Sequence, residues 1–271
     1  ENKCESNTKC NDFVKLYGIE LLPNTPNFMN FLNKKGIKIS KKIGNGLQGN
    51  IYLGKFKGIY VAIKMANIKL CNKGISMING NKSIRVHENI LKEYKIMSYL
   101  NDIKNKPLGF VNIYGLLYDK WNYYLVMEYC GISMFDYISN NHKRHNKNSI
   151  LSNNFEINWK IHIRKLFKQI AIFISFLHKN NCCHLDISLE NLLISNNIVY
   201  FCDYGLAEIF PCNNFNTNKY CGKSNYEAPE VYKKRGYFNG KKADIWCLGV
   251  VLFMMLTGVP LYKKASLSDP Y

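Results

Sequence analysis

Short β-branched runs separated by glycines constrain the fold of this chain more than any other feature. Residues 37–46, 49–56 and 57–65 carry the letters IKISKKIGNG, GNIYLGKF and KGIYVAIKM. β-branched and aromatic residues favour strands, and glycines between short strands mark tight turns. The pattern predicts a three-stranded antiparallel meander over Ile37 to Lys64.

One helix and two more strands are predicted after this meander. Residues 65–83 are irregular and polar, and residues 83–100 then carry apolar side chains at helical spacing. Two strand-like runs follow, FVNIYGLLY at 110–118 and NYYLVMEY at 122–129. The first half of the chain therefore predicts a five-stranded sheet with one helix packed against it.

The second half of the chain predicts a mainly helical unit. Residues 133–140 suggest a short helix, and the polar run NNHKRHNKNSILSNN at 140–154 predicts a solvated loop. Residues 159–180 show the pattern of a long amphipathic helix. The remaining elements are two short strands and a helix that is apolar on nearly every face, at residues 192–195, 198–203 and 241–257.

Charge and cysteine usage narrow the class of protein. Thirty-seven Lys and Arg against 19 Asp and Glu give a net charge of +18, and the lysines are spread along the chain. That spread favours a solvated basic surface over a dedicated nucleic-acid or membrane patch. The ten cysteines show no C-x-x-C spacing and most lie in apolar runs, which predicts a reducing compartment such as the cytoplasm. No apolar run reaches the roughly 18 residues of a membrane-spanning helix.

A glycine cluster followed by a lysine suggests a phosphate site. Gly44-x-Gly46-x-x-Gly49 lies between two predicted strands. Glycine lets backbone N–H groups approach phosphate oxygens with no side chain between them. A glycine-rich hairpin without a ligand has the same letters, so both interpretations stay open on the glycines alone. The third strand ends in Lys64, which is placed to reach back under such a flap.

With this lysine the chain resembles the eukaryotic protein kinase family. The resemblance covers about residues 37–262, and the remaining landmarks follow in the family's order. The landmarks are Glu93 on the predicted helix, Met127-Glu128-Tyr129-Cys130 at a strand end, His184-Leu185-Asp186 with Asn191, Asp203-Tyr204-Gly205, Ala228-Pro229-Glu230, and Asp244-Ile245-Trp246 with Gly249. The motif at residues 184–191, the family's catalytic loop, is far more specific than the glycines.

The resemblance implies an α+β, bilobal protein-kinase fold. Residues 1–36 would be an N-terminal extension, residues 37–130 a five-stranded N-lobe with its helix C, and residues 131–271 a mainly helical C-lobe. Family members continue past the helix at 241–257 with several more helices, so we expect a truncated C-lobe. The sequence begins at Glu1 without an initiator Met, which suggests an excised piece.

ATP, Mg²⁺ and a protein substrate are the ligands that the resemblance implies. Lys64 would hold the phosphates and pair with Glu93, and Asp186 would accept the proton of the substrate hydroxyl. Asn191 and Asp203 would supply oxygen ligands to Mg²⁺. The residues expected against the nucleotide are Ile43, Gly44, Asn45, Gly46, Leu47, Gln48, Gly49, Ile51, Ala62, Lys64, Met127, Glu128, Cys130 and Leu193.

Three positions depart from the family pattern. The arginine that normally precedes the catalytic aspartate is Leu185, a non-RD loop, so the usual partner of a phosphate on the activation segment is missing. Ser188 stands where Ser/Thr-specific members carry a lysine, and Lys223 stands where they carry a threonine. The two residue types look exchanged. We therefore expect Lys223 to supply the catalytic charge that Ser188 cannot.

These observations predict an ATP-dependent protein kinase directed at serine and threonine hydroxyls. The alternative is a nucleotide-binding pseudokinase that acts as a scaffold, which Leu185 and Ser188 motivate. Retention of the catalytic carboxylate and of both metal ligands favours the enzyme. A basic nucleic-acid-binding role comes third.

Overall fold

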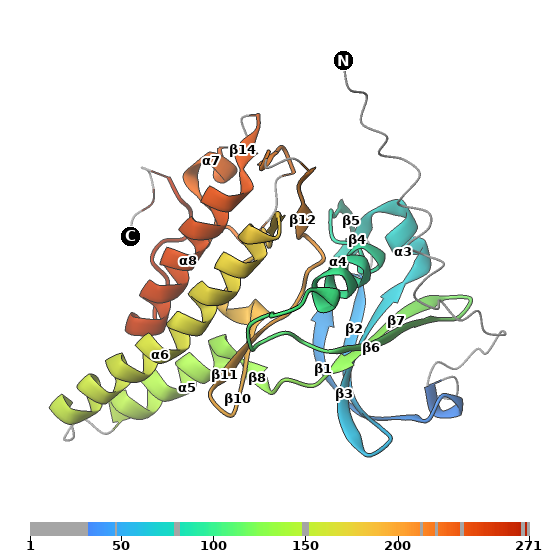
Figure 1. Ribbon diagram of the computed structural model, residues 1–271, viewed down its shortest axis with the longest axis horizontal. Helices are drawn as coiled ribbons and strands as arrows, with labels where there is room; N and C mark the ends of the chain where they lie inside the picture. The colour runs from blue at the N-terminus through green and yellow to red at the C-terminus, as the bar shows by residue number, and fades with distance from the viewer. Residues whose placement is uncertain are drawn as a thin grey trace. The chain divides into compact units, whose positions relative to one another are not determined.

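The fold is that of a computed structural model (Figure 1). It describes residues 32–46, 48–78, 82–147, 152–211, 214–219, 222–233, 236–266 and 269. The chain forms two compact units, one of Glu1–Leu100 with Asn112–Tyr129 and one of Asn101–Val111 with Cys130–Tyr271. The N-terminal extension expected over residues 1–36 lies mostly outside the described residues.

The first unit is built on a five-stranded antiparallel sheet, as predicted. In spatial order its strands are β1 (Ile37–Gly46), β2 (Gly49–Phe56), β3 (Ile59–Asn67), β7 (Asn122–Glu128) and β6 (Ile113–Tyr118). Successive side chains of a strand point to opposite faces. Val61 and Ile63 are fully buried in an apolar core on one face, so Ala62 and Lys64 belong to the other face.

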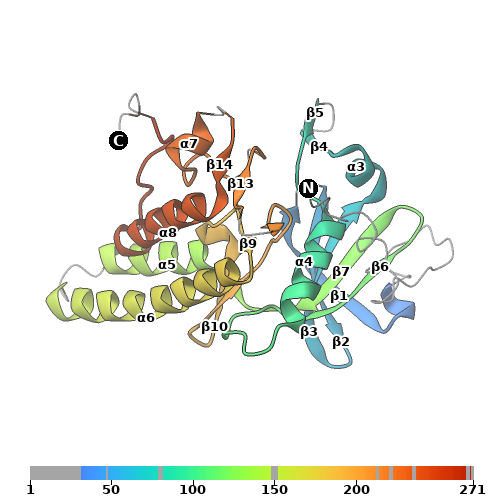
Figure 2. The same ribbon diagram turned by 45° about the horizontal axis from the view of Figure 1, so that its top comes forward.

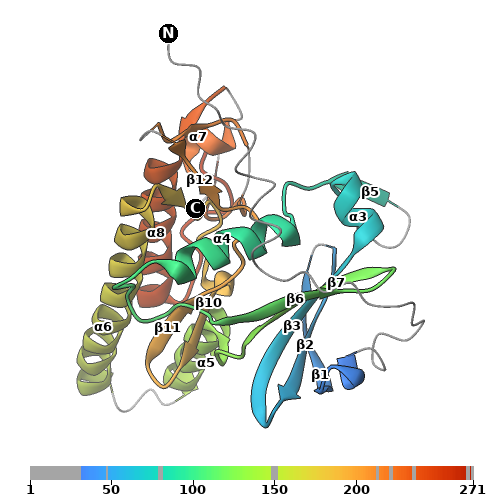
Figure 3. The same ribbon diagram turned by 45° about the vertical axis from the view of Figure 1, so that its right-hand side comes forward.

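The helix α4 (Ile90–Asp102) is fastened to β3 by a hydrogen bond from Lys64 to Glu93 and runs beside the sheet (Figures 2 and 3). Asn89 begins this helix, because its Oδ1 accepts hydrogen bonds from the N–H groups of Leu91 and Lys92. Such a cap satisfies donors that the first turn leaves unpaired. The predicted helix over 83–100 is therefore wrong at its start, where the chain is extended.

Residues 68–85 hold more structure than the irregular polar stretch predicted there. A short helix and two antiparallel strands occupy this region, namely α3 (Ile68–Lys73), β4 (Ile75–Ile78) and β5 (Lys82–Arg85). The Oδ1 of Asn67 accepts from two N–H groups at the start of α3, and Gly74 ends the helix with a left-handed φ of 61°. Both are cap signals, and α3, β4 and β5 are each too short to show a period.

Three long helices form the body of the second unit. They are α5 (Met134–Lys147), α6 (Ser152–Lys179) and α8 (Gly240–Thr257), and Figures 1 and 2 show α6 running alongside the other two. The position of α8 confirms the predicted apolar helix. The solvated loop predicted at 140–154 is wrong over residues 140–147 and 152–154, which belong to α5 and α6, and residues 148–151 lie outside the described residues. Helices α5 and α6 are joined where Tyr137 Oη lies 2.8 Å from His162 Nε2.

Short strands and turns shape the loops between these helices. They are β8 (Ile132–Ser133), β10 (Leu192–Ser195) and β11 (Ile198–Phe201) in one sheet, β9 (Cys182–Cys183) paired with β12 (Glu208–Ile209), β13 (Asn216–Thr217) paired with β14 (Phe238–Asn239), the 3-10 turn η1 (Leu189–Asn191) and the helix α7 (Pro229–Tyr232). The strands predicted near 192–203 are confirmed. Because β9 ends just before residue 184 and η1 ends at 191, the loop between them is held at both ends. Among the described helices, none has the length and apolar character needed to cross a bilayer.

Candidate active site

A buried lysine with two carboxylates is the main ionic centre of the first unit. Lys64 Nζ lies 2.7 Å from Glu93 Oε2 and 2.8 Å from Glu88 Oε1. The side chains of Lys64 and Glu93 are 8% and 1% exposed, so solvent screens the pair little. The predicted Lys64–Glu93 contact is present. Glu88 was missed, because residues 83–100 are predicted as one helix, whereas α4 begins at Ile90 and residue 88 stands before it.

The glycine hairpin between β1 and β2 lies next to this lysine. Ile51 on β2 is the cross-strand partner of Lys64, and a side chain at Gly46 would come within 3.8 Å of Lys64 Cε. At Gly49 a Cβ atom would lie 1.9 Å from the carbonyl oxygen of Met65, so only glycine fits there. The hairpin backbone therefore passes close to the lysine without an intervening side chain.

The other residues predicted against a nucleotide in the first unit lie on β1 and on the lysine face of the sheet, except Glu128, whose cross-strand partner on β3 is Val61 of the core face. Ala62 and Met127 are cross-strand partners on β3 and β7, while Ile43 on β1 is 39% exposed. Gln48 is different: its Nε2 donates to the carbonyl oxygens of Leu70 and Ile75, so its side chain points toward α3 and β4. At position 48 a phosphate would therefore be contacted by backbone groups and not by the side chain. Leu47 lies outside the described residues.

In the second unit, Asn191 orients the carboxylate of Asp186. Its Nδ2 donates to Asp186 Oδ2 at 2.6 Å and to the main-chain oxygen of Asp186 at 2.8 Å. Asn191 is 92% buried within η1, so this amide is held firmly. The arrangement leaves Asp186 as a carboxylate of fixed direction on a loop closed at both ends, which suits a proton acceptor.

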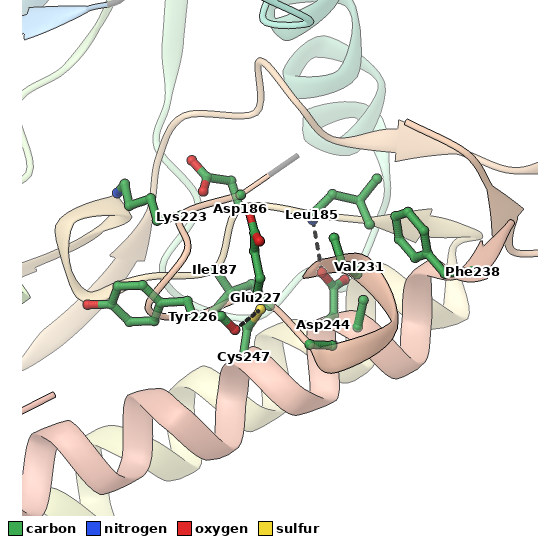
Figure 4. Close-up of a pocket in the computed structure, with 13 residues that line it drawn as sticks. Leu185, Asp186, Ile187, Lys223, Tyr226, Glu227, Val231, Phe238, Asp244 and Cys247 are labelled. Carbon is green, nitrogen blue, oxygen red and sulfur yellow. Dashed lines mark hydrogen bonds between the residues drawn. The ribbon is translucent and has the colours of Figure 1, made fainter. Parts of the chain in front are cut away.

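Asp244 anchors the catalytic loop from below. Its two oxygens accept hydrogen bonds from the backbone N–H groups of His184 and Leu185, each at 2.9 Å, and His178 Nε2 lies 2.9 Å from the same carboxylate. Leu185 has a left-handed φ of 63°, which costs about 1–3 kcal/mol in a residue with a side chain. The fully buried Asp244 offsets this strain (Figure 4). Helix α8, which carries Asp244, therefore fixes the backbone geometry of the catalytic loop.

Leu185 belongs to an apolar cluster that joins the catalytic loop to the activation segment, residues 203–230. Figure 4 shows Leu185 on the same side of the pocket as Val231 and Phe238. The buried members of this cluster are Cys183, Leu185, Phe210, Phe215, Ala228, Val231, Phe238 and Ala243. Position 185 is thus tied to the activation segment by hydrophobic contact instead of by charge.

Lys223 of the activation segment reaches the catalytic loop. Its Nζ donates to Ser188 Oγ at 2.7 Å, and Glu190 Oε2 and Asn191 Oδ1 follow at 3.3 and 3.5 Å. The carbonyl oxygen of Lys223 accepts from the N–H groups of Tyr226 and Glu227, so its backbone is fixed as well. The structure brings together the two residues whose types looked exchanged in the sequence.

Two titratable groups around this loop stay neutral near physiological pH. Burial lowers the pKa of His184, and burial followed by the charge of Glu190 raises the pKa of Tyr226. The Tyr226 hydroxyl accepts a hydrogen bond from the backbone N–H of Leu189 at 3.3 Å. Neither His184 nor Tyr226 therefore adds charge to the site.

Comparison with known proteins decides the family. The model of the protein kinase domain matches residues 37–270. The chain belongs to the protein kinase family. This confirms the resemblance that the motifs carry and the α+β class predicted from the sequence.

The relatives of this kinase domain are longer proteins. A carbon catabolite-derepressing protein kinase of Candida tropicalis is 30% identical over 258 residues, which are 90% of this chain and 36% of that protein. CBL-interacting serine/threonine-protein kinase 10 of Arabidopsis thaliana is 29% identical over 86% of this chain and 43% of its own length. NUAK family SNF1-like kinase 1 of Mus musculus is 27% identical over 83% and 30%. The chain spans less than half the length of these relatives.

The kinase family generally uses ATP and Mg²⁺, and the donor groups of the second unit fit the cation. Mg²⁺ prefers oxygen ligands. Asn191 commits its Nδ2 to Asp186 and turns its Oδ1 away from that carboxylate, and Asp203 follows β11 with a left-handed φ of 63°. Cys130 is buried two residues before β8, and Leu193 on β10 is the cross-strand partner of Ser133 on β8. These two predicted nucleotide contacts belong to the second unit.

Proposed function

We propose that this chain transfers the γ-phosphoryl group of ATP to serine and threonine hydroxyls of a protein. The observation that carries the proposal is the Asp186 carboxylate, held at 2.6 Å by the amide of a buried Asn191 on a loop that Asp244 anchors. A protein that only bound nucleotide would gain nothing from so fixed a proton acceptor. The kinase relatives with serine/threonine in their names support the choice of hydroxyl.

In the proposed step the substrate hydroxyl oxygen attacks the γ-phosphorus. A bond forms between that oxygen and phosphorus, the bond from phosphorus to the β–γ bridging oxygen breaks, and ADP leaves with the electron pair. Asp186 accepts the hydroxyl proton. Bound Mg²⁺, held by Asn191 and Asp203, would neutralise phosphate charge. The chain's own contribution is to orient the hydroxyl and to offset charge with its lysines.

Lys64 is proposed to bind the phosphates beneath the glycine hairpin. Its ammonium already has Glu93 at 2.7 Å, which fixes the side chain on the face of the sheet opposite to the core. The nucleotide contacts proposed around it are Ile43, Gly44, Asn45, Gly46, Leu47, the backbone of Gln48, Gly49, Ile51, Ala62, Met127, Glu128, Cys130 and Leu193.

The kinase is proposed to be of the non-RD type, with an activation segment that needs no phosphate to be ordered. A phosphate is usually held by the arginine before the catalytic aspartate. Here Leu185 packs with Phe210 and Phe215 of the activation segment instead. Hydrophobic contacts of this kind are present without any modification.

A transfer assay separates the enzyme from the pseudokinase alternative. The chain is incubated with radiolabelled ATP, Mg²⁺ and a degenerate peptide library, beside Asp186→Asn. We expect transfer by the wild type and a loss of about a hundred- to a thousandfold in the variant. Nucleotide binding by calorimetry with no transfer by the wild type would support the scaffold and refute the enzyme. Label on tyrosine alone would refute the proposed hydroxyl class.

A further inference from the structure

We infer that Lys223 of the activation segment is a catalytic residue whose positive charge stabilises the phosphoryl group during its transfer. The inference rests on the proposed phosphoryl transfer and assigns a residue to it. It is carried by the contact of Lys223 Nζ with the catalytic loop, within which Asn191 joins the lysine to Asp186.

The charge balance of the loop requires a cation. Asp186 and Glu190 are carboxylates within five residues, and ATP brings several more negative charges to the same loop. Ser188 at the centre of this group is fully buried and has only a neutral hydroxyl. Lys223, 3.3 Å from Glu190, is a cation that the structure places against this loop. Removing it would take away one of the positive charges proposed to offset the loop's carboxylates and the phosphates, beside Lys64 and Mg²⁺.

The ammonium is anchored and still able to turn. An ammonium has three donors. One Lys223 donor makes a short bond of 2.7 Å to the Ser188 hydroxyl, whereas the contacts to Glu190 and Asn191 are long, at 3.3 and 3.5 Å. Long contacts are weak, so these two donors can turn to a phosphate oxygen at little cost while the short bond holds the nitrogen in place. Ser188 thus acts as a positioning residue for the lysine.

A lysine that is merely solvated would not have these contacts. Lys160, for comparison, pairs with Glu156 one helical turn away, and both side chains are about 60% exposed. The Lys223 side chain is 37% exposed, and the carbonyl oxygen of the same residue accepts two backbone hydrogen bonds. Its contacts bridge 32 to 35 residues of sequence. They therefore depend on the folded activation segment.

An exchange experiment tests this inference. Lys223→Thr should lower kcat by about a hundredfold with a smaller change in the KM for ATP, because a charge that acts in the transition state is lost. Adding Ser188→Lys to that variant should recover most of the loss, since two positions serving one site are not additive. Lys219→Thr is the matched control: Lys219 lies on the same segment and pairs with Glu208, so its loss should change kcat by less than about threefold.

A second readout does not depend on turnover. In the Asp186→Asn variant, Lys223 should be protected from reductive methylation by a nonhydrolysable ATP analogue with Mg²⁺, while Lys219 stays equally reactive with and without the nucleotide. Circular dichroism checks that each variant is folded.

The outcomes separate this inference from the proposed function. If the wild type transfers phosphate but Lys223→Thr is nearly as active, or if the double variant is no better than the single one, the role of Lys223 is refuted and the kinase activity stands. Unchanged methylation of Lys223 in the presence of nucleotide refutes direct contact. If the wild type transfers nothing, the proposed function itself fails.

Discussion

The two units of this chain hold their functional groups by different physical means. In the first unit, Lys64 is buried between two carboxylates at 2.7 and 2.8 Å. In the second unit, an apolar cluster around Leu185 holds the activation segment, and the nearby ion pair of Lys223 and Glu190 is more than a third exposed and 3.3 Å long. Unit charges 4 Å apart interact by about 4 kcal/mol in a protein-like medium and by about 1 kcal/mol in water.

The difference teaches which substitutions should affect folding and which should affect only chemistry. A buried charge whose partner is removed stays buried without compensation, whereas a half-exposed charge is solvated when its partner is lost. Substitutions around Lys64 should therefore change stability and activity together. Loss of Lys223 should leave the fold intact and change the rate alone.

The largest expected effect is that of Lys64→Met. It should abolish transfer and also lower the free energy of unfolding by about 3–5 kcal/mol, because Glu88 and Glu93 are left buried and facing each other. Urea unfolding followed by fluorescence measures this loss. Adding Glu93→Gln to Lys64→Met should restore much of the stability and none of the activity. A single variant as stable as the wild type would show that the first unit is not held by this charge cluster.

Leu185→Ala tests the apolar cluster of the second unit in the same way. Truncating a buried leucine should cost about 2–5 kcal/mol, and here the loss should loosen the activation segment as well. Leu108→Ala is the control, because Leu108 is 76% exposed and its truncation should change stability by less than about 0.5 kcal/mol. Limited proteolysis should show faster cleavage within residues 203–230 of Leu185→Ala only. Equal cleavage in both variants would contradict the idea that the apolar cluster orders this segment.

The sequence predicted the strands and the Lys64–Glu93 contact better than it predicted the surroundings of the candidate site. Lys64, Asp186 and Asn191 belong to motifs with strong local signals, and the five strands have runs rich in β-branched and aromatic residues, the first three of which are separated by glycines. Glu88 has no such signal, because it lies within the run predicted as helix and reaches Lys64 only because α4 begins later, at Ile90. The elements over 68–85 were missed for a related reason, since caps at Asn67 and Gly74 carry little weight beside a polar composition. The contact between Lys223 and Ser188 depends on tertiary folding, so only the paired exchange of residue types hinted at it.

Glu88→Gln should have a smaller effect and the opposite sign from loss of Glu93. Lys64 has two carboxylates for one charge, so removing Glu88 takes away surplus negative charge from the proposed phosphate site. The KM for ATP should fall by about fivefold, which corresponds to about 1 kcal/mol. Glu93→Gln should instead lower kcat/KM, because it removes the contact that fixes the lysine to α4. If the two variants behave alike, the two carboxylates are equivalent and Glu88 has no separate effect on nucleotide binding.

The smallest expected effect is that of removing phosphate from the activation segment. Phosphate on this segment stabilises an active kinase when a cation beside the catalytic aspartate receives it. Here Leu185 stands at that position inside an apolar cluster, and Thr217 of the segment is 95% buried, where a phosphate would be costly. Phosphatase treatment of the purified chain should therefore leave transfer within about twofold of the untreated protein, and Ser224→Asp, at an exposed position, should do the same. If phosphatase abolishes activity and rephosphorylation restores it, another basic residue receives a phosphate. In that case charge, and not apolar packing, orders the activation segment of the second unit.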